Sequence, residues 1–255
     1  MALALMAALP EELHPLRAAL EDAQLQHHAG REFHTGRLDG HDVVLVLSRI
    51  GKVAAATTAA MLIERYGAEA IVFTGVAGGL GGTVQVGDVV VARELLQHDL
   101  DASPLFPRHE VPGTARTRFP SDAALSDALA RAARAALDAE RIGLAESLAT
   151  LGIERPTVHE GLVVSGDRFV ATAIEGQALR AELPDALAVE MEGAAVAQVC
   201  HDCDVPFAVL RTVSDRADDS ASVDFRRFVD EVAGPVAGAI LRRWLREAPP
   251  PPDVP

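Results

Sequence analysis

Hydrophobic residues along the chain fall into short continuous runs, separated by polar turns or by alanine-rich stretches. A short apolar run bounded by turn residues is typical of a buried strand, whereas a longer stretch of helix formers predicts a helix. The first run covers residues 2–9, and Pro10 after it suits the first turn of a helix. Asp39-Gly40, between two further runs, predicts the turn of a β-hairpin.

The same pattern predicts strands and helices in alternation along the rest of the chain. We expect further strands at 31–38, 42–48, 70–74, 86–92, 158–164, 186–189 and 207–213. We expect helices at 54–66, at 121–151 with a break near Gly143, at 190–200 and at 222–246. This alternation predicts an α/β fold, a three-layer αβα sandwich in which helices cover both faces of a central mixed sheet.

The length and composition favour one folded unit. The chain has 255 residues, of which 49% are hydrophobic, enough for one large core. No internal repeat or linker divides it, so we expect one domain over residues 1–248. Residues 249–255 contain four consecutive prolines, which cannot continue a helix, and predict a disordered tail.

The charge balance narrows the class of partner. The chain carries 23 basic and 37 acidic residues, a formal net charge of −14, which repels nucleic acid and anionic membrane surfaces. No apolar run reaches the roughly 18 residues that a membrane span needs. The two cysteines are too few for disulfide bonds to stabilise a fold of this size, so we expect the protein in the reducing cytoplasm.

Two motifs that suggest a cofactor or a metal do not meet the requirements of such sites. The glycines between Gly75 and Gly82 have the wrong spacing for a dinucleotide-binding loop, and a predicted strand follows them. They either let a ligand approach the backbone closely or form a tight turn. Cys200 and Cys203 have C-x-x-C spacing, but they close a predicted helix and no second ligand pair accompanies them. We therefore expect no cofactor and no metal site.

Charged residues at the ends of apolar strands are the candidates for chemistry. Glu190 and Glu192 stand where a predicted strand passes into a helix, and Arg211 interrupts the next strand, which leads to Asp215. In α/β sheets, ligands bind at the ends of strands. The alternative is structural: an ion pair from Arg211 to either glutamate, with Asp215 as a helix cap. Glu12 likewise falls in a first helical turn, where the helix dipole favours an acidic residue.

The order of these residues along the chain adds a more specific signal. Each of them lies within a short stretch of sequence, and these stretches occur in the same order in a known group of enzymes. Through these stretches the chain resembles the nucleoside phosphorylase superfamily. Within it, the chain is most similar to the 5′-methylthioadenosine/S-adenosylhomocysteine nucleosidases. The stretches are Ala8-Leu9-Pro10-Glu11-Glu12, Gly51-Lys52-Val53, Thr74-Gly75-Val76-Ala77-Gly78-Gly79, Val86-Gly87-Asp88-Val89-Val90, His98-Asp99-Leu100-Asp101, Ser165-Gly166-Asp167-Arg168-Phe169, Val189-Glu190-Met191-Glu192 and Arg211-Thr212-Val213-Ser214-Asp215.

The resemblance implies hydrolysis of the N-glycosidic bond of 5′-methylthioadenosine and S-adenosylhomocysteine, with 5′-deoxyadenosine as a further substrate. The products are adenine and the thioribose. By the family pattern, Asp215, oriented by Ser214, protonates N7 of adenine. Glu192 binds the ribose hydroxyls as the ring becomes cationic. Glu12 takes a proton from the attacking water, and Arg211 holds that water.

The resemblance also implies which residues contact the rest of the substrate. Phe169 is expected to stack on adenine, and the backbone of Val170 to read the edge of the base. The residues expected around the alkylthio group are Leu105, Phe106 and Pro112 of a neighbouring subunit and Phe225 of the same chain. The other residues expected at the substrate are Val76, Ala77, Gly78, Glu190 and Met191. A pocket shared in this way implies a homodimer.

Two departures from the family pattern leave alternatives open. Val76 stands where relatives commonly have serine, and the region 137–156 is longer than expected. A purine nucleoside phosphorylase of the same superfamily would use phosphate instead of water. Phosphate binding requires several donors and positive charge, and the site stretches contain few cations, namely Lys52, Arg168 and Arg211. The remaining alternatives are a sister nucleosidase acting on futalosine or another 5′-modified adenosine, and a non-catalytic nucleoside-binding protein.

Overall fold

The computed structural model describes residues 2–140, 143, 145–153, 155–217 and 225–248. The tail expected at 249–255 lies outside the described residues, as do the first residues of the helix expected at 222–246. The strands are β1 (Ala2–Ala7), β2 (Glu21–His28), β3 (Arg31–Leu38), β4 (His41–Leu47), β5 (Ala68–Gly79), β6 (Val89–Gln97), β7 (Phe119–Pro120), β8 (Val158–Ser165), β9 (Ala186–Glu190) and β10 (Phe207–Asp215). The helices are α1 (Pro10–Ala18), α2 (Lys52–Tyr66), α3 (Ala123–Glu140), α4 (Ala145–Thr150), α5 (Ala173–Glu182), α6 (Gly193–Asp202), α7 (Phe225–Phe228), the π-helical turn Val229–Ala233 and α8 (Gly234–Glu247).

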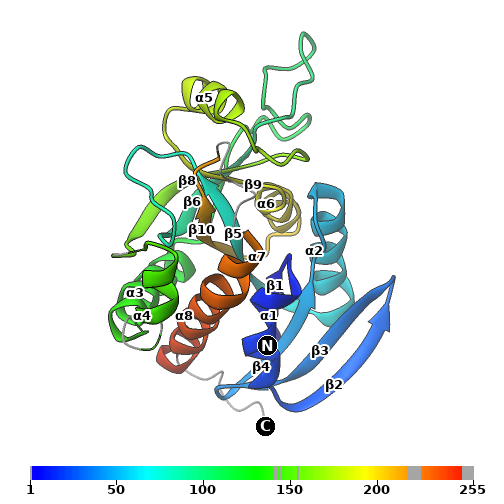
Figure 1. Cartoon of the computed structure of the whole chain (residues 1–255). Coiled ribbons are helices and arrows are strands. Elements are labelled where there is room, and N and C mark those ends of the chain that lie inside the picture. The colour runs from blue at the N-terminus through cyan, green and yellow to red at the C-terminus, as the bar shows by residue number, and fades with distance from the viewer. Residues whose placement is uncertain (1, 141–142, 144, 154, 218–224, 249–255) are drawn as a thin grey trace.

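A mixed sheet forms the centre of the molecule, with helices on both of its faces (Figure 1). Helices α1, α3 and α8 pack on one face, and α2 and α6 pack against each other on the opposite face. The α/β fold expected from the sequence is therefore confirmed. None of the described helices is long and apolar enough to cross a membrane.

Part of the sheet closes on itself. Strand β5 pairs with β10 on one side and with the short β9 on the other, and β10, β6, β8 and β9 complete the circuit. At the closing point, Gly78 pairs with both Val189 of β9 and Asp215 of β10. A Cβ atom on Gly78 would lie only 2.9 Å from the Asp215 carboxylate, so a glycine is required where these three strands meet.

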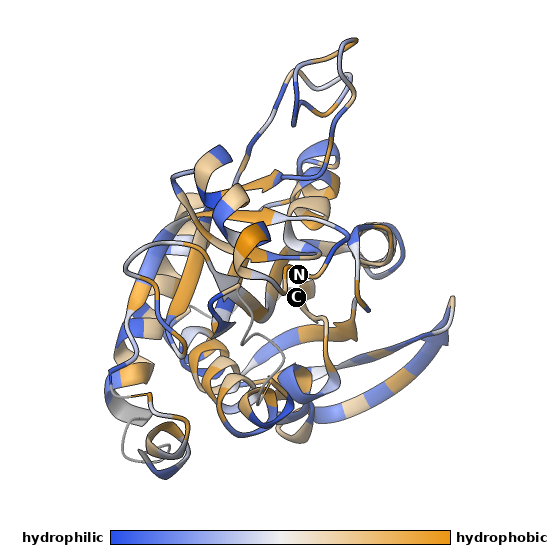
Figure 2. Ribbon diagram, turned by 45° about the horizontal axis from the view of Figure 1, so that its top comes forward, coloured by the Kyte–Doolittle hydropathy of each residue, from blue (hydrophilic) through white to orange (hydrophobic). Residues whose placement is uncertain are grey.

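Differences from the expected elements concern polar or glycine-rich segments. Strand β5 continues through the glycines as far as Gly79, where a loop was expected from Gly75 onward. Helix α6 begins at Gly193, so Glu190 and Glu192 precede it. Strand β2 and helix α5 were not expected, and β2 is exposed along almost its whole length, without the apolar alternation that marks a half-buried strand. In Figure 2 the outer hairpin of β2 and β3 is correspondingly rich in hydrophilic residues.

Candidate active site

A cavity of about 410 Å³ opens where β1, β5, β9 and β10 end, a size suited to a small-molecule ligand. It collects residues far apart in the sequence, including every expected catalytic residue. The expected residues that line it are Glu12, Val76, Ala77, Gly78, Phe169, Val170, Glu190, Met191, Glu192, Arg211, Ser214, Asp215 and Phe225. No role was expected for the other lining residues, which are Ala8, Leu9, Ile50, Gly75, Arg168 and Val189.

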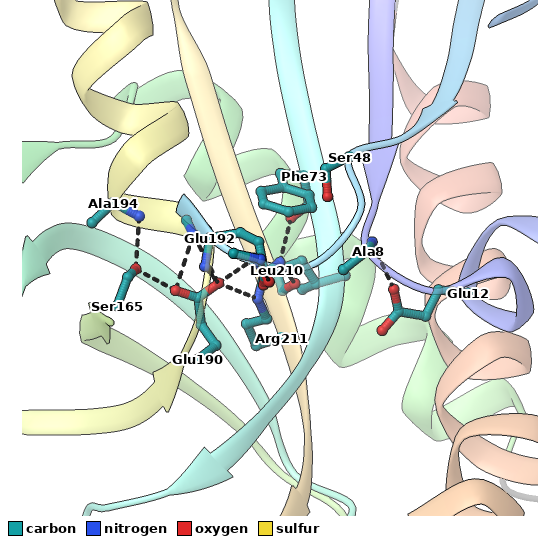
Figure 3. A network of polar contacts seen from close by, with 12 residues as sticks. Ala8, Glu12, Ser48, Phe73, Ser165, Glu190, Glu192, Ala194, Leu210 and Arg211 are labelled. Atoms are coloured by element: carbon teal, nitrogen blue, oxygen red, sulfur yellow. Dashed lines mark hydrogen bonds and ion pairs between the residues drawn. The ribbon is translucent and has the colours of Figure 1, made fainter. Parts of the chain in front are cut away.

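Arg211 reaches from β10 into the interior, where it forms a buried ion pair with Glu190 (Figure 3). Its Nη2 and Nε donate to Glu190 Oε2 at 2.6 and 3.2 Å, and Nη1 donates to the carbonyl oxygens of Phe73 and Leu210 at 3.1 and 3.0 Å. The guanidinium also lies 4.2 Å from the centre of the Phe73 ring. All three guanidinium nitrogens therefore donate to protein groups, and the Glu190 carboxylate compensates the charge of Arg211.

Glu190 is held by the start of α6 as well as by Arg211. The amides of Glu192 and Gly193 donate to its carboxylate at 3.2 and 2.8 Å, and the Ser165 hydroxyl donates to Oε1. The Ser165 hydroxyl in turn accepts from the amide of Ala194 at 2.7 Å. Glu190 thus compensates both the cation and the amide groups that begin a helix. These contacts favour a positioning role, and direct binding of substrate by Glu190 stays a prediction.

Glu192 is oriented by the amide of Gly51, which donates to its Oε1 at 2.8 Å. Burial, followed by the nearby Glu190 carboxylate, raises the pKa of Glu192 to about 7. Gly51 immediately precedes α2 and has a φ of +97°, a conformation that favours glycine. In the sequence, the Gly51-Lys52 pair before a predicted helix could have predicted this contact, because the first amides of a helix have no hydrogen-bond partner within that helix.

Glu12 is held by backbone amides on one oxygen only. Its Oε2 accepts from Ala8 and Leu9 at 3.0 and 2.9 Å, whereas its buried Oε1 has no hydrogen-bond partner among the described residues. Burial raises the pKa of Glu12 to about 7, against the opposing effects of Arg211 and of the backbone amides of Leu9, Ala8 and Val76. A Cβ atom on Gly75 would lie 3.4 Å from Glu12 Oε1, so any side chain at this position would pack directly against that oxygen.

Asp215 ends β10 with both carboxylate oxygens engaged. Ser214 donates its hydroxyl to Oδ2 at 2.8 Å, as expected, and the amide of Ala217 donates to Oδ1 at 2.8 Å. The aromatic rings of Phe169 and Phe225 meet edge to face nearby, with ring centres 6.4 Å apart. The cavity therefore combines four carboxylates, of which Glu190 is paired with Arg211, with an aromatic rim, an arrangement that can bind and protonate a planar base.

Leu105, Phe106 and Pro112 do not line the cavity of their own chain. They lie between β6 and α3 in a segment that projects from the body of the molecule (Figure 1). The Leu105 side chain is 85% exposed, so most of this apolar side chain is in contact with water.

The described residues contain no group of three His, Cys, Asp or Glu side chains arranged to hold a metal ion. Cys200 is buried, and burial raises the pKa of its thiol to about 12, while Cys203 is exposed. The Cys200 thiol thus lacks the lowered pKa that metal binding or redox chemistry would need.

Comparison with known proteins agrees with this geometry. The sequence profile of the phosphorylase superfamily matches residues 2–246. The chain belongs to the phosphorylase superfamily. It is 39% identical over 243 residues to the 5′-methylthioadenosine/S-adenosylhomocysteine nucleosidase of Mycobacterium tuberculosis, which covers 92% of this chain and 93% of the relative. The corresponding protein of Bacillus thuringiensis is 38% identical over 234 residues, 91% of this chain and 94% of the relative.

Solved structures of the superfamily place the chain in the same group. The nucleosidase of Neisseria meningitidis, in complex with methylthio-immucillin-A, superposes with a TM-score of 0.84 at 33% identity, covering 97% of this chain and 99% of that one. The nucleosidase of Colwellia psychrerythraea, in complex with adenine, superposes with a TM-score of 0.82 at 34% identity, covering 96% and 94%. Within the phosphorylase superfamily, the chain therefore belongs to the 5′-methylthioadenosine/S-adenosylhomocysteine nucleosidases.

The buried ion pair gives a first prediction for this superfamily member. Glu190→Gln should lower the free energy of unfolding by about 3–5 kcal/mol, because it leaves Arg211 as an uncompensated buried charge. Glu247→Gln is the matched control, since it breaks an exposed pair with Arg243 and should cost less than about 1 kcal/mol. Urea denaturation of both variants measures the difference. Equal losses for the two would mean that Glu190 is not required to compensate the cation.

The raised pKa of Glu12 gives a second prediction. Between pH 4.5 and about 7 the folded protein retains a proton on Glu12 that the unfolded chain releases, so this group's contribution to stability declines as the pH rises. Glu12→Gln resembles the protonated form and should remove that decline. Relative to the parent, it should gain up to about 3 kcal/mol between pH 5 and pH 8 in urea denaturation. A difference that is the same at both pH values would contradict the assignment.

Proposed function

We propose that the protein hydrolyses the N-glycosidic bond of 5′-methylthioadenosine and S-adenosylhomocysteine, releasing adenine and the corresponding thioribose. The observation that carries the proposal is the buried, unpartnered Oε1 of Glu12, on a carboxyl with a pKa of about 7, in one cavity with Glu192 and Asp215. The nucleosidases that resemble this chain bind methylthio-immucillin-A or adenine in their solved structures. The reducing cytoplasm, where we place the protein, suits its two free cysteines.

The three carboxylates divide the reaction between them. Asp215 delivers a proton to N7 of adenine as the bond to the sugar breaks, and Ser214 and the Ala217 amide fix its orientation. Glu192 is held at Oε1 by Gly51, so its second oxygen is directed to the ribose hydroxyls. The interaction strengthens as the ribose gains positive charge in the transition state.

Glu12 acts as the general base toward water. A base with a pKa near the working pH combines a useful ionised fraction with proton affinity, and a pKa of about 7 meets that condition. Arg211 lies close enough to lower the pKa of Glu12, but its nitrogens are engaged with Glu190 and with two carbonyl groups. We therefore assign Arg211 to charge compensation instead of to direct contact with the water.

Apolar residues complete the substrate pocket. Phe169 is 48% exposed at the rim and close to Phe225, where it can stack on the base. The backbone of Val170 is assigned to the edge of adenine, and Met191 to the face of the sugar. Val76 also lines the cavity and offers no hydroxyl to the sugar or the water.

Hydrolysis fits the cavity better than phosphorolysis. A bound phosphate requires several donors and positive charge. The two arginines among the described lining residues are both paired, Arg211 with Glu190 and Arg168 with Glu175. The remaining charged side chains of the lining are the carboxylates, which repel phosphate. Water therefore suits this site as the attacking nucleophile.

The decisive experiment follows adenine release from 5′-methylthioadenosine by the purified protein, with and without inorganic phosphate. Free methylthioribose in the absence of phosphate is the expected product. A requirement for phosphate, with formation of the sugar 1-phosphate, would overturn the nucleosidase assignment. Futalosine and 5′-deoxyadenosine are tested in parallel, and a strong preference for futalosine would assign the protein to a sister nucleosidase.

Asp215→Asn should lower kcat by about 10²-fold or more, because an amide cannot deliver the proton. Binding of 5′-methylthioadenosine, measured by calorimetry, should change little. Asp230→Asn, on the exposed side of the C-terminal helical region, is the matched control and should keep full activity. Unchanged turnover in Asp215→Asn would show that another group protonates the base.

We further infer a homodimer in which Leu105, Phe106 and Pro112 of one subunit complete the alkylthio pocket of the other. The support is the projecting segment that carries them and its exposed apolar side chains. Val53 and Ile50, at the start of α2, are also exposed, at 77% and 59%, and Ile50 lines the cavity. Apolar surface of this kind beside a ligand site marks an interaction surface.

A subunit-mixing experiment tests the shared pocket. The double substitution Leu105→Ala with Phe106→Ala should raise KM for 5′-methylthioadenosine and leave KM for adenosine nearly unchanged. Asp215→Asn subunits alone should be inactive. Mixed dimers should regain sites with the parental KM, because one subunit supplies the intact acid and its partner the intact segment. Absence of such sites in a mixture shown to contain mixed dimers would contradict the shared pocket.

A further inference from the structure

A second cavity, of about 250 Å³, lies beside the active site but shares no lining residue with it. It is bounded by α1, by the turn between β2 and β3, and by the segment that follows β4. Its charged and titratable lining residues are His14, Arg17, Arg31, Glu32, His34 and Arg49. We propose that this pocket binds a small phosphate-type dianion, either inorganic phosphate or the phosphate group of a small monoester.

Helix α1 contributes one of its faces to this pocket. Pro10, Leu13, His14 and Arg17 follow the spacing of three and four residues that places side chains on one side of a helix. Glu12 points to the nucleoside cavity instead. One helix thus serves two separate pockets, and the second has no part in the carboxylate chemistry of the first.

Two of the arginines are fixed by hydrogen bonds that do not neutralise them. Arg31 donates from Nε to Thr58 Oγ1 at 2.6 Å and from Nη2 to the carbonyl oxygen of Ala54 at 3.1 Å. Arg49 donates to the carbonyl oxygen of Gly30, and its φ of +66° is unusual for a residue with a side chain. Neutral acceptors therefore hold both cations at the pocket, an arrangement that leaves their charge available to a ligand.

The charge of the pocket is not compensated by the protein. Within the described part of the chain, none of Arg17, Arg31 and Arg49 has a carboxylate within 4.0 Å. The one acidic lining residue, Glu32, lies 3.7 Å from His34. After burial, the nearby Arg17 is the largest cause that lowers the pKa of His34. A basic pocket of this kind on a chain of net charge −14 selects for an anion by local charge.

The dimensions of the pocket limit the size of the anion. Its volume is well below that of the nucleoside cavity, and below the range typical of sites for drug-sized ligands. Arginine guanidinium groups match the oxygen geometry of phosphate, and a dianion gains more than a carboxylate from several cations. The pocket therefore favours phosphate or a compact monoester over a nucleotide.

The test measures binding of inorganic phosphate and, in a separate arm, of ribose 5-phosphate to the full-length protein by calorimetry at low ionic strength. The proposal expects saturable binding of at least one of them. It also expects the anion to shift the imidazole signals of His34 in NMR spectra. Arg17→Gln with Arg49→Gln should weaken binding by about tenfold or more, since each removes a charge-assisted contact. The arm with the tighter binding identifies the source of the dianion.

Arg65→Gln with Arg131→Gln is the matched control, because both arginines are exposed and lie outside this pocket, and this pair of substitutions removes two positive charges, as the test variant does. It should retain parental affinity, and the melting temperatures of all variants should stay close to that of the parent. Two outcomes would overturn the proposal: no binding of either anion at millimolar concentration, or binding that the double substitution leaves intact. The proposal does not rest on the nucleosidase function, which the adenine-release assay tests separately.

Discussion

The buried ion pair between Arg211 and Glu190 is the interaction on which the arrangement of the site depends. Two charges removed from water are tolerated only when further hydrogen bonds satisfy both of them. Here the carbonyl groups of Phe73 and Leu210 satisfy the cation, and the amides that begin α6 satisfy the anion. Because these partners belong to β5, β10 and the β9–α6 connection, the pair fixes the relative positions of the elements from which Glu192 and Asp215 project.

Backbone amides orient each of the three carboxylates assigned to the chemistry. Glu12 is held by Ala8 and Leu9, Glu192 by Gly51, and Asp215 by Ala217. Such donors are fixed by the fold and cannot rotate away, so the carboxylates are positioned before a ligand arrives. Burial without a neutralising cation on Glu12 and Glu192 raises both pKa values to about 7, which allows these two groups to change protonation near neutral pH.

The sequence was sufficient to predict the alternating elements and the motif residues of the cavity, since apolar runs and ordered motifs are local features. By resemblance it assigned Glu192 to the ribose hydroxyls, but it could not show which of Glu190 and Glu192 pairs with Arg211. Both flank Met191 at the same strand end, and only the positions of Arg211 and Gly51 in three dimensions distinguish them. It also could not show that β5 continues to Gly79, because pairing with β9 and β10, and not intrinsic strand propensity, extends the strand through the glycines.

Because the sheet closes on itself through β5 and β10, few of its strands offer an unpaired backbone edge to another copy of the protein. A strand in a closed circuit has both backbone edges paired, so within the described residues β2 is the one long strand with a free edge. Free edges invite strand addition from other molecules, which leads to uncontrolled polymerisation. The exposed strand Glu21–His28 carries acidic residues, glutamines and histidines on that edge. A polar, hydrated border of this kind protects the molecule from edge-to-edge aggregation.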